Sequence, residues 1–332
     1  MEHELSISEE KIKEMFRSMA QNLPAWLRVP TATYRLQFNY RFKFSDAKSI
    51  ISYLNELGIS DCYASPYFTA NKGSLHGYDI LDHNQLNPEI GTDEEYEAFV
   101  EELKKYDMGQ ILDIVPNHMS VAGNENSWWM DVLENGPVST YADFFDIDWS
   151  PLKIELKNKV LLPILGDQYG RVLENQELNL TFEEGAFFIR YGDRKLPLDP
   201  VSYNRVLKFR VDELENDTGK DHPHLQELLS ITTALSHLPS SVEKKGEERM
   251  ERQREKEIVK KRLGNLCKES ERIRSFINGN VVAFNGEKGD PKSFSRLDEL
   301  GPGAGGQIRR GRHAGLFSRG GHPGGQTFSG SG

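Results

Sequence analysis

Two short strings in the first third of the chain hold the side chains best suited to bind and orient a polar ligand. They are SLHGYD at residues 74–79 and DIVPNHM at residues 113–119. A tyrosine ring offers an apolar face with a polar tip, an imidazole donates or accepts hydrogen bonds, and a carboxylate orients neighbouring donors. Chemistry of this kind needs the two strings to meet, so the elements that carry them decide the interpretation.

Residues 31–64 follow a strand, helix, strand pattern. Residues 31–38 (TATYRLQF) are rich in β-branched and aromatic residues and predict a strand. Ser45 is the expected N-cap of the following helix, and Gly58 is its expected C′ residue. Its apolar positions are Ile50, Ile51, Leu54 and Leu57. Residues 59–64 predict the second strand.

A second helix and a third strand follow after a long loop. Thr92 and Glu95 form an expected capping box, and the buried stripe of the helix is expected at Tyr96, Phe99, Val100 and Leu103. Residues 110–115 (QILDIV) are almost wholly apolar, as expected of a strand covered on both faces. This alternation predicts right-handed βαβ crossovers and a parallel sheet.

Parallel sheets bind ligands at the carboxyl ends of their strands. The loops at 65–91 and 116–149 follow the second and third strands, and both are long for simple connections. We therefore expect the functional site in these two loops, which contain the two strings.

The second half of the chain has weaker patterns. Residues 159–165 and 185–191, with 171–182 between them, are expected to form short antiparallel strands, and 223–238 a helix. Residues 242–275 predict a charged helix with a solvated face, a partner-binding face being the alternative. Residues 301–332 contain twelve Gly, four Arg and no acidic residue, so we expect them to be disordered.

Composition excludes several classes of function. The formal charge of −10 argues against general binding to nucleic acid or to an anionic membrane. The two cysteines, Cys62 and Cys267, lack the paired spacing of zinc or dithiol sites, so we expect both to be reduced thiols. We expect no metal and no other cofactor. Residues 1–16 are acidic and amphipathic, unlike a signal peptide. The cytoplasm is the expected location.

Together the two strings resemble the first sequence region of the alpha-amylase clan of glycoside hydrolases. Several strings resemble the N-terminal half of the maltooligosyltrehalose synthase family more closely: PTATYRLQF (30–38), SPY (65–67), GSLHGYD (73–79), NHM (117–119) and FNGEKGDP (284–291). The resemblance covers about residues 28 to 300 and stops at Leu300.

The resemblance implies an α/β fold, a partial (β/α)8 TIM barrel of alpha-amylase type with inserted small β and helical subdomains. The expected parts are an N-terminal helical extension at 1–27, the first part of the barrel at 28–150, a small β-rich insertion at 151–200, a helical insertion at 201–300 and the tail at 301–332.

The resemblance also implies a substrate-binding set of Tyr78, His118, Asn117 and His76. Tyr78 would stack on the glucose being transferred, and His118 would contact the 6-hydroxyl of that glucose. Packing is the alternative role for both side chains. The asparagine that Asn117 resembles binds calcium in many amylases of the clan. We do not expect calcium here because no Asp-rich partner loop is evident.

Asp113, Asp79 and Arg35 are expected to orient the substrate-binding set without touching substrate. Five aromatic residues in the second loop are expected to form a core, a sugar-binding face being the alternative: Trp128, Trp129, Tyr141, Phe144 and Phe145.

The implied reaction is an intramolecular transglucosylation that converts the reducing-end α-1,4 link of a maltooligosaccharide into an α,α-1,1 link. The clan's nucleophile lies in a Gly-x-Arg-x-Asp string that this chain does not contain. Residues 209–212 (FRVD) are nearest, but they lack the Gly, so Asp212 is not assigned as nucleophile and no catalytic residue is assigned. The change of composition after Leu300 suggests a truncated or frameshifted reading, with an inactive product.

Two alternative functions remain open: ordinary α-glucan hydrolysis and glucan binding without catalysis. An RNA-binding role for the Arg/Gly tail is disfavoured by the net negative charge. The resemblance further implies a partner, a hydrolase that releases trehalose from the product.

Overall fold

The structure is a computed structural model that describes residues 9–21, 28–239, 246–300 and 306–310. Its contacts divide the chain into two compact units, Met1–Ser120 and Val121–Gly332. The finer division into five parts stays a prediction. The first unit ends directly after the second of the two strings, so both strings belong to the same unit.

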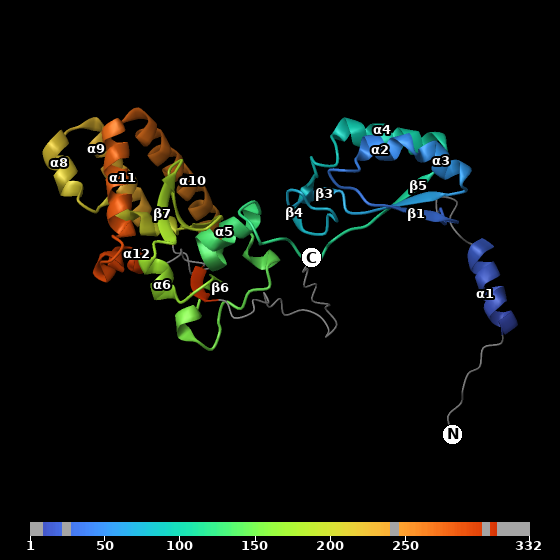
Figure 1. The fold of residues 1–332 in the computed structure, drawn as a ribbon, viewed down its shortest axis with the longest axis horizontal. Coiled ribbons are helices and arrows are strands. Elements are labelled where there is room, and N and C mark those ends of the chain that lie inside the picture. The colour runs from blue at the N-terminus through green and yellow to red at the C-terminus, as the bar shows by residue number, and fades with distance from the viewer. Residues whose placement is uncertain (1–8, 22–27, 240–245, 301–305, 311–332) are drawn as a thin grey trace, which may run out of the picture. The chain divides into compact units, whose positions relative to one another are not determined.

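The first unit is built on a parallel sheet of three strands in the order β1-β2-β5. The strands are β1 (Thr33–Leu36), β2 (Asp61–Ala64) and β5 (Gly109–Leu112). Helices α2 (Phe44–Ser49), α3 (Ile51–Glu56) and α4 (Asp93–Lys105) connect them and lie on one side of the sheet (Figure 1). Helix α1 (Glu9–Gln21) precedes the sheet. The predicted α/β class, part of a (β/α)8 barrel, is confirmed.

An antiparallel hairpin lies within the loop after β2. It consists of β3 (Phe68–Ala70) and β4 (Ile80–Leu86), with the string 74–79 at its tip. The backbone N–H of Ser120 donates to the carbonyl of Ile80 at 2.7 Å. This bond ties the end of the second string to the start of β4.

The covered face of the sheet packs on aromatic side chains. Phe38, Phe44, Tyr67 and Phe99 are buried together, and the Tyr67 ring meets both Phe38 and Phe44 edge-on at 5.0 Å between centroids. Cys62 is buried in the same core as a free thiol, and burial raises its pKa to about 11. The thiol is therefore neutral and inert at ordinary pH.

The helix signals of the first unit were confirmed in part. Thr92 and Glu95 make both bonds of the capping box at the start of α4, and Gly58 has the left-handed φ of +85° expected at C′. Ser45 as N-cap was wrong. The helix begins at Phe44 because its buried ring and its N–H, bonded to the carbonyl of Ile90 at 2.9 Å, fix that residue first.

The expectation that the third strand is covered on both faces was also wrong. Ile111 and Leu112 of β5 are 37% and 48% exposed. The three helices lie on one side of the sheet, and β5 is an edge strand within it. The other face of the sheet is therefore open in the described part of the first unit.

The second unit combines a small antiparallel sheet with a helical layer. Its sheet has the order β7-β8-β9, formed by Leu178–Glu183, Ala186–Tyr191 and Arg194–Pro197. The main helices are α5 (Ser127–Asn135), α9 (Pro223–Ser236), α10 (Gly246–Glu269) and α11 (Glu271–Asn285). The shorter helices are α6 (Tyr169–Glu174), α7 (Tyr203–Leu207), α8 (Val211–Thr218) and α12 (Ser295–Leu300). Their apolar faces share one core, in which Cys267 is a free thiol.

Strands β6 (Val160–Leu165) and β10 (Gly306–Arg310) pair in parallel. The predicted antiparallel pairing of β6 was therefore wrong, whereas that of β7 and β8 was confirmed. Part of the segment 171–182 is helical, in α6. Residues 306–310 are a strand rather than disordered, because the edge of β6 supplies their hydrogen-bond partners. The expectation of disorder for 301–305 and 311–332 falls outside the described residues.

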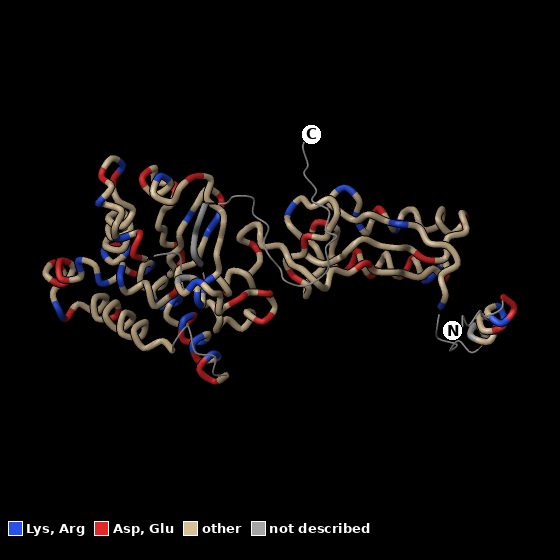
Figure 2. Tube along the Cα trace, turned by 90° about the horizontal axis from the view of Figure 1, so that it is seen from below, with Lys and Arg blue, Asp and Glu red and all other residues tan. Residues whose placement is uncertain are grey.

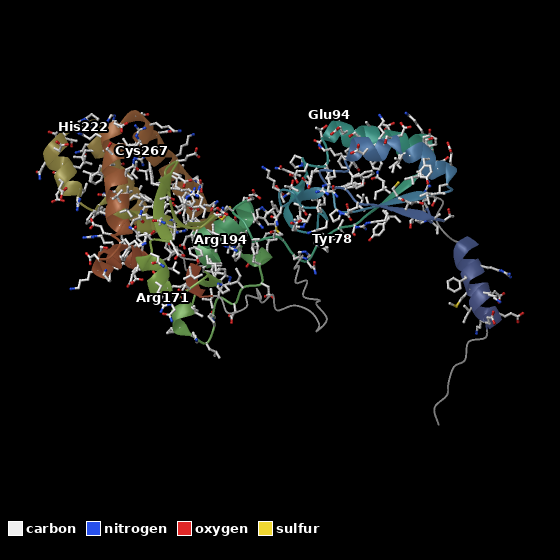
Figure 3. The ribbon with its side chains drawn as sticks, viewed as in Figure 1. Tyr78, Glu94, Arg171, Arg194, His222 and Cys267 are labelled. Carbon is white, nitrogen blue, oxygen red and sulfur yellow. The ribbon has the colours of Figure 1, made fainter. Side chains whose placement is uncertain are left out.

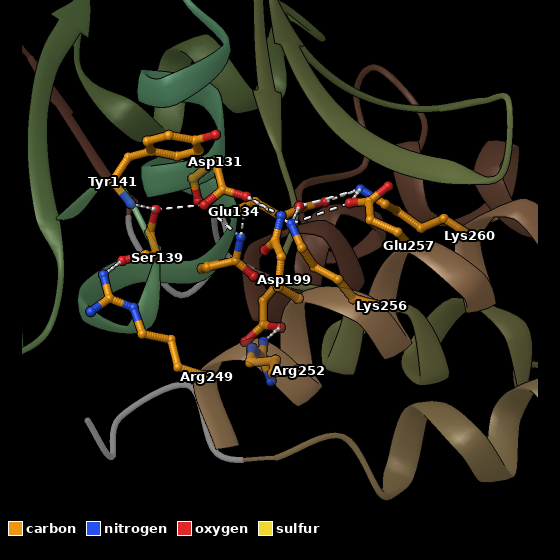
Figure 4. A network of polar contacts seen from close by, with 12 residues as sticks. Asp131, Glu134, Ser139, Tyr141, Asp199, Arg249, Arg252, Lys256, Glu257 and Lys260 are labelled. Atoms are coloured by element: carbon orange, nitrogen blue, oxygen red, sulfur yellow. Dashed lines mark hydrogen bonds and ion pairs between the residues drawn. The ribbon is translucent and has the colours of Figure 1, made fainter. Parts of the chain in front are cut away.

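Helix α10 is not the solvated helix that its composition suggests. Arg252, Lys256, Val259 and Leu263 form one helical stripe and are at most 2% exposed. Acidic and basic residues are interleaved along the described chain (Figure 2). In α10 the two buried cations are neutralised by carboxylates from other segments of the chain. Lys256 Nζ contacts Asp131 Oδ1 at 2.9 Å and also binds Glu134, both on α5 (Figure 4).

Candidate functional site

The open face of the sheet in the first unit holds a cluster of polar side chains from its three strands. In the strand register Arg35 lies opposite Tyr63, which lies opposite Ile111. The N–H of Asp113 continues the ladder beyond β5 by donating to the carbonyl of Ala64 at 3.0 Å. Side chains on opposed residues point to the same face, so Arg35, Tyr63 and Asp113 converge.

Asp113 is the acceptor at the centre of this cluster. One carboxylate oxygen, Oδ2, accepts from Arg35 Nη1 at 3.0 Å, from the Tyr63 hydroxyl at 3.2 Å and from the Tyr78 hydroxyl. The hydrogen bond from Tyr78 lowers the pKa of Asp113 most, and those from Arg35 and Tyr63 lower it further. Asp113 is therefore ionised, with Oδ2 bound by three donors, which suits an orienting role rather than a nucleophilic or proton-transfer role.

Arg35 joins the sheet to the tip of the β3–β4 hairpin. Its Nη2 donates to the Tyr78 hydroxyl at 2.8 Å, and its guanidinium lies over the Tyr63 ring at 4.3 Å from the centroid. Burial opposes the charge of Arg35, but the hydrogen bonds to Asp113 and Tyr78 prevail and raise its pKa. Burial and the bond to Asp113 raise the pKa of Tyr78, so its hydroxyl stays protonated and donates. The tip of the Tyr78 ring is thereby fixed.

His118 and Tyr78 are brought together by the backbone. His118 Nε2 lies 3.1 Å from the carbonyl oxygen of Tyr78, and Nδ1 lies 2.8 Å from Asn117 Oδ1. A carbonyl only accepts, so Nε2 carries a proton. A neutral ring then requires the Asn117 amide to turn its NH2 toward Nδ1. Both His118 and Asn117 are exposed to solvent.

The string 74–79 is held by its own polar residues. The Tyr78 N–H donates to His76 Nδ1 at 3.1 Å, and the two rings are nearly parallel, 6.1 Å apart and inclined by 23°. Asp79 accepts from the Ser74 hydroxyl at 2.5 Å. Figure 3 shows Tyr78 at the end of the first unit where β3 and β4 lie. Asp79 therefore stabilises the loop, while His76 lies beside the aromatic ring.

Gly77 is required by the shape of this loop. Its φ is +75°, and a Cβ at this position would lie 3.1 Å from the carbonyl oxygen of Pro66. Gln37 and Asn39, which follow β1, donate side-chain hydrogen bonds to the carbonyl of Leu75 at 3.3 and 3.1 Å. The carboxyl end of β1 thus anchors the loop that carries Tyr78.

The structure brings all seven residues predicted for the site into one region of the first unit. It adds Tyr63, Ser74, Gln37 and Asn39, which the sequence interpretation missed. The alternation of β2 was a usable signal for Tyr63, since it points to the same face as Arg35. The loop contacts of Gln37 and Asn39 had no comparable signal.

Asp212 lies elsewhere. It is in the first turn of α8 in the second unit, two residues after the N-cap Arg210, whose φ is +56°. A helix start of this kind is not the carboxyl end of a parallel strand, so the residue does not occupy the position of the clan's nucleophile. The described residues contain no group of three or more His, Cys, Asp and Glu side chains placed to hold a metal.

The family model for the alpha-amylase catalytic domain matches residues 46–197. The matched segment, a little under half of the chain, is similar to that catalytic domain. Its relatives include a putative maltooligosyl trehalose synthase of Mycobacterium tuberculosis, 39% identical over 178 residues that cover 52% of this chain and 22% of that protein. An intracellular maltogenic amylase of Bacillus subtilis is 36% identical over 102 residues, 31% of this chain and 16% of that protein.

Solved structures of maltooligosyl trehalose synthases also match this chain. A crystal structure of a maltooligosyl trehalose synthase is 39% identical to this chain, with a TM-score of 0.47. The match covers 51% of this chain and 23% of the chain in that structure. The enzyme from Arthrobacter ramosus is 36% identical with a TM-score of 0.45, and the match covers 51% of this chain and 21% of that one. The 39% sequence identity to the Mycobacterium protein confirms the resemblance inferred from the motifs, and the matched region spans about a fifth of the relatives' length.

Among the described residues no helix is both long enough and apolar enough to cross a bilayer.

Proposed function

We propose that the Tyr78–His118 region binds the glucose unit at which an α-glucan is remodelled, in a protein of the maltooligosyl trehalose synthase type. The observation that carries the proposal is the junction of two loops from neighbouring parallel strands. His118 contacts the backbone carbonyl of Tyr78 at 3.1 Å, and Arg35 and Asp113 fix the Tyr78 hydroxyl from the sheet.

The chemistry of a glucose ring suits this arrangement. A sugar ring presents C–H groups on its faces and hydroxyls around its edge, so it needs one aromatic surface and several hydrogen-bonding groups. Tyr78 supplies the ring, held at its tip by Arg35 and Asp113. A sugar hydroxyl can enter between the exposed His118 and Asn117 and replace their mutual hydrogen bond.

The cluster binds and orients but does not break a glycosidic bond. Retaining chemistry needs two carboxyl groups about 5–5.5 Å apart, one free to act as nucleophile and the other to transfer a proton. Asp113 accepts from three donors, and Asp79 accepts from Ser74. The proposed transglucosylation of a reducing-end α-1,4 link to an α,α-1,1 link therefore needs carboxylates outside this cluster.

Hydrolysis is the second candidate, favoured by the 36% identity to the maltogenic amylase over 102 residues. The binding cluster serves both reactions, because they differ in the acceptor, which is water in one and the turned glucose in the other. Binding without turnover is the third outcome. Cytoplasmic location and a trehalose-releasing partner enzyme remain predictions.

Calorimetry with maltopentaose tests the proposal directly. We expect Tyr78→Ala and His118→Gln each to weaken binding by roughly tenfold, about 1.4 kcal/mol, the size of one stacking or hydrogen-bonding contact. Tyr53→Ala is the matched control, because Tyr53 is 60% exposed on α3 and outside the cluster. Unchanged affinity in both site variants would contradict the proposal.

Product analysis separates the three reactions. The chain is incubated with maltopentaose, and reducing ends and non-reducing products are measured together. A loss of reducing ends without shorter sugars indicates the mutase, a gain of reducing ends indicates the hydrolase, and no change with measurable affinity indicates a glucan-binding protein.

A further inference from the structure

Five aromatic side chains of the second unit, expected to form one core, divide into two groups. Trp129 is 5% exposed and packs on Phe145, which lies against the core of the unit. Trp128, Tyr141 and Phe144 instead contact one another, and we call these three residues the aromatic shelf. The prediction of a core is therefore correct for Trp129 and Phe145, and also for Tyr141, which is half-buried against the same core.

The shelf is ordered by ring stacking and is open to solvent at Phe144. The rings of Trp128 and Tyr141 are stacked with centroids 5.0 Å apart and planes inclined by 12°, and Phe144 lies 4.8 Å from Trp128. Trp128 is half-buried, and Phe144 is 65% exposed. Keeping the Phe144 ring in water forgoes about 1.5–3 kcal/mol of burial, which a ligand lying on that ring would recover.

The shelf is anchored to the buried ion network of the unit. Ser139 Oγ accepts from the N–H of Tyr141 at 3.1 Å and donates to Asp131, which contacts Lys256 Nζ at 2.9 Å (Figure 4). The N–H of Phe144 donates to the carbonyl of Tyr141 at 3.1 Å. A shelf fixed in this way loses little conformational entropy when a ligand binds.

Carboxylates surround the exposed ring in the sequence. Asp143 precedes Phe144, is 75% exposed at its side chain and lies 3.7 Å from Arg249 Nη1. Asp146 and Asp148 are also exposed. Carboxylates accept hydrogen bonds from hydroxyl groups and repel anions. An aromatic surface next to acceptors suits a neutral ligand with apolar faces and a hydroxyl edge.

We infer that the aromatic shelf is a second glucan-binding surface, on which a glucose ring of an α-1,4-glucan lies against Phe144 and Trp128 while its hydroxyls donate to neighbouring carboxylates. The inference rests on the proposed function for the class of ligand, but it concerns another unit and other residues than the Tyr78–His118 region.

Binding of maltoheptaose to the full chain tests the inference, by calorimetry and by tryptophan fluorescence. Phe144→Ala removes an exposed ring, so the fold is retained and the affinity falls by roughly tenfold, the effect of one stacking contact. Trp128→Phe abolishes the fluorescence change caused by the sugar. Tyr53→Ala, which removes a ring of similar exposure from α3, leaves both signals unchanged.

The same measurements in a Tyr78→Ala background separate the two sites. Persistence of the fluorescence change on adding maltoheptaose supports the shelf even if the Tyr78 site fails. An affinity of Phe144→Ala within twofold of the parent overturns the inference, whatever Tyr78→Ala does. A dimer that becomes monomeric in Phe144→Ala with unchanged affinity also overturns it, because the shelf is then a contact between copies. Absence of any maltoheptaose binding by the parent chain overturns both proposals.

Discussion

The two units each contain a cluster of cations, carboxylates and tyrosines, but burial gives the clusters different roles. In the first unit Arg35 is 33% and Asp113 18% exposed at the side chain. In the second unit Lys256 is 1% and Glu134 7% exposed. The open cluster orients a loop that carries candidate ligand-binding groups, whereas the closed one joins α5 to α10 inside the unit. The same residue types therefore form a candidate site where they are partly exposed and a structural ion network where they are buried.

The ion pairs of the buried network shift the pKa of Lys256. Burial lowers the pKa of Lys256, but Glu134 and Asp131 outweigh it, and the net shift is upward. The ion pairing of Lys256 therefore contributes its full stability below about pH 10.4, the pKa of a lysine in the unfolded chain. The contribution is lost as the pH rises above that value towards the higher pKa of the folded state. Removing one partner would leave the other charge without compensation in a poorly solvated place.

The largest expected effect is that of Lys256→Met. Loss of the ammonium leaves Glu134 and Asp131 buried with fewer partners, and we expect a cost of about 3–5 kcal/mol in the free energy of unfolding of the second unit. Urea denaturation followed by hydrogen exchange of α5 and α10 peptides measures it. Lys261→Met on the same helix is the control, since Lys261 is exposed, and a cost as small as that of the control would mean that the network is not structural.

A smaller effect is expected when the open cluster loses its cation. Arg35→Met should cost about 1 kcal/mol of stability or less, because partly exposed ion pairs contribute little. It should nevertheless weaken maltopentaose binding, since the Tyr78 ring loses one of its two anchors. Urea denaturation measures the stability and calorimetry measures the maltopentaose affinity. Hydrogen-exchange rates of residues 74–79 report whether the loop has lost its anchor. A stability loss as large as that of Lys256→Met would remove the contrast between the two units.

Glycines in the turns of the second unit offer a further comparison of close packing with open space. A Cβ on Gly185, at φ +90°, would lie 2.0 Å from the carbonyl oxygen of Lys260, whereas one on Gly192, at φ +55°, would meet nothing within 4 Å. We expect Gly185→Ala to cost about 3 kcal/mol and Gly192→Ala about 1 kcal/mol in thermal or urea unfolding. Equal costs would show that the hairpin can move away from α10.

The smallest effect is the pH dependence of the open cluster. Its hydrogen bonds, that from Tyr78 first, hold the pKa of Asp113 below its ordinary value. The ionised contacts are therefore complete above about pH 4, the unfolded value, and are lost only as the pH falls through the lower folded value. Maltopentaose affinity measured from pH 7 to pH 3 should stay level and then decline, and Asp113→Asn should remove the decline.

Local signals in the sequence predicted much of the first unit. The parallel strands, the capping box of α4 and the glycine at 58 depend on neighbouring residues, and the structure has them. The candidate site residues were predicted from two strings that follow neighbouring strands, and the structure brings these strings together. Tyr63 was missed although strand alternation points it toward Arg35, and Gln37 and Asn39 were missed because their partners are backbone carbonyls in a distant loop.

By itself the sequence determined the α/β order, the positions of the strand ends and the residue types of the candidate site, because these follow from periodicity and local hydrogen bonding. Only the tertiary structure decided which charges are buried. The stripe of α10 contains Arg252 and Lys256, and its interleaved charges suggested a solvated helix. The carboxylates that neutralise Lys256 lie on α5, more than 120 residues earlier, and burial of an ion depends on partners that local sequence does not supply.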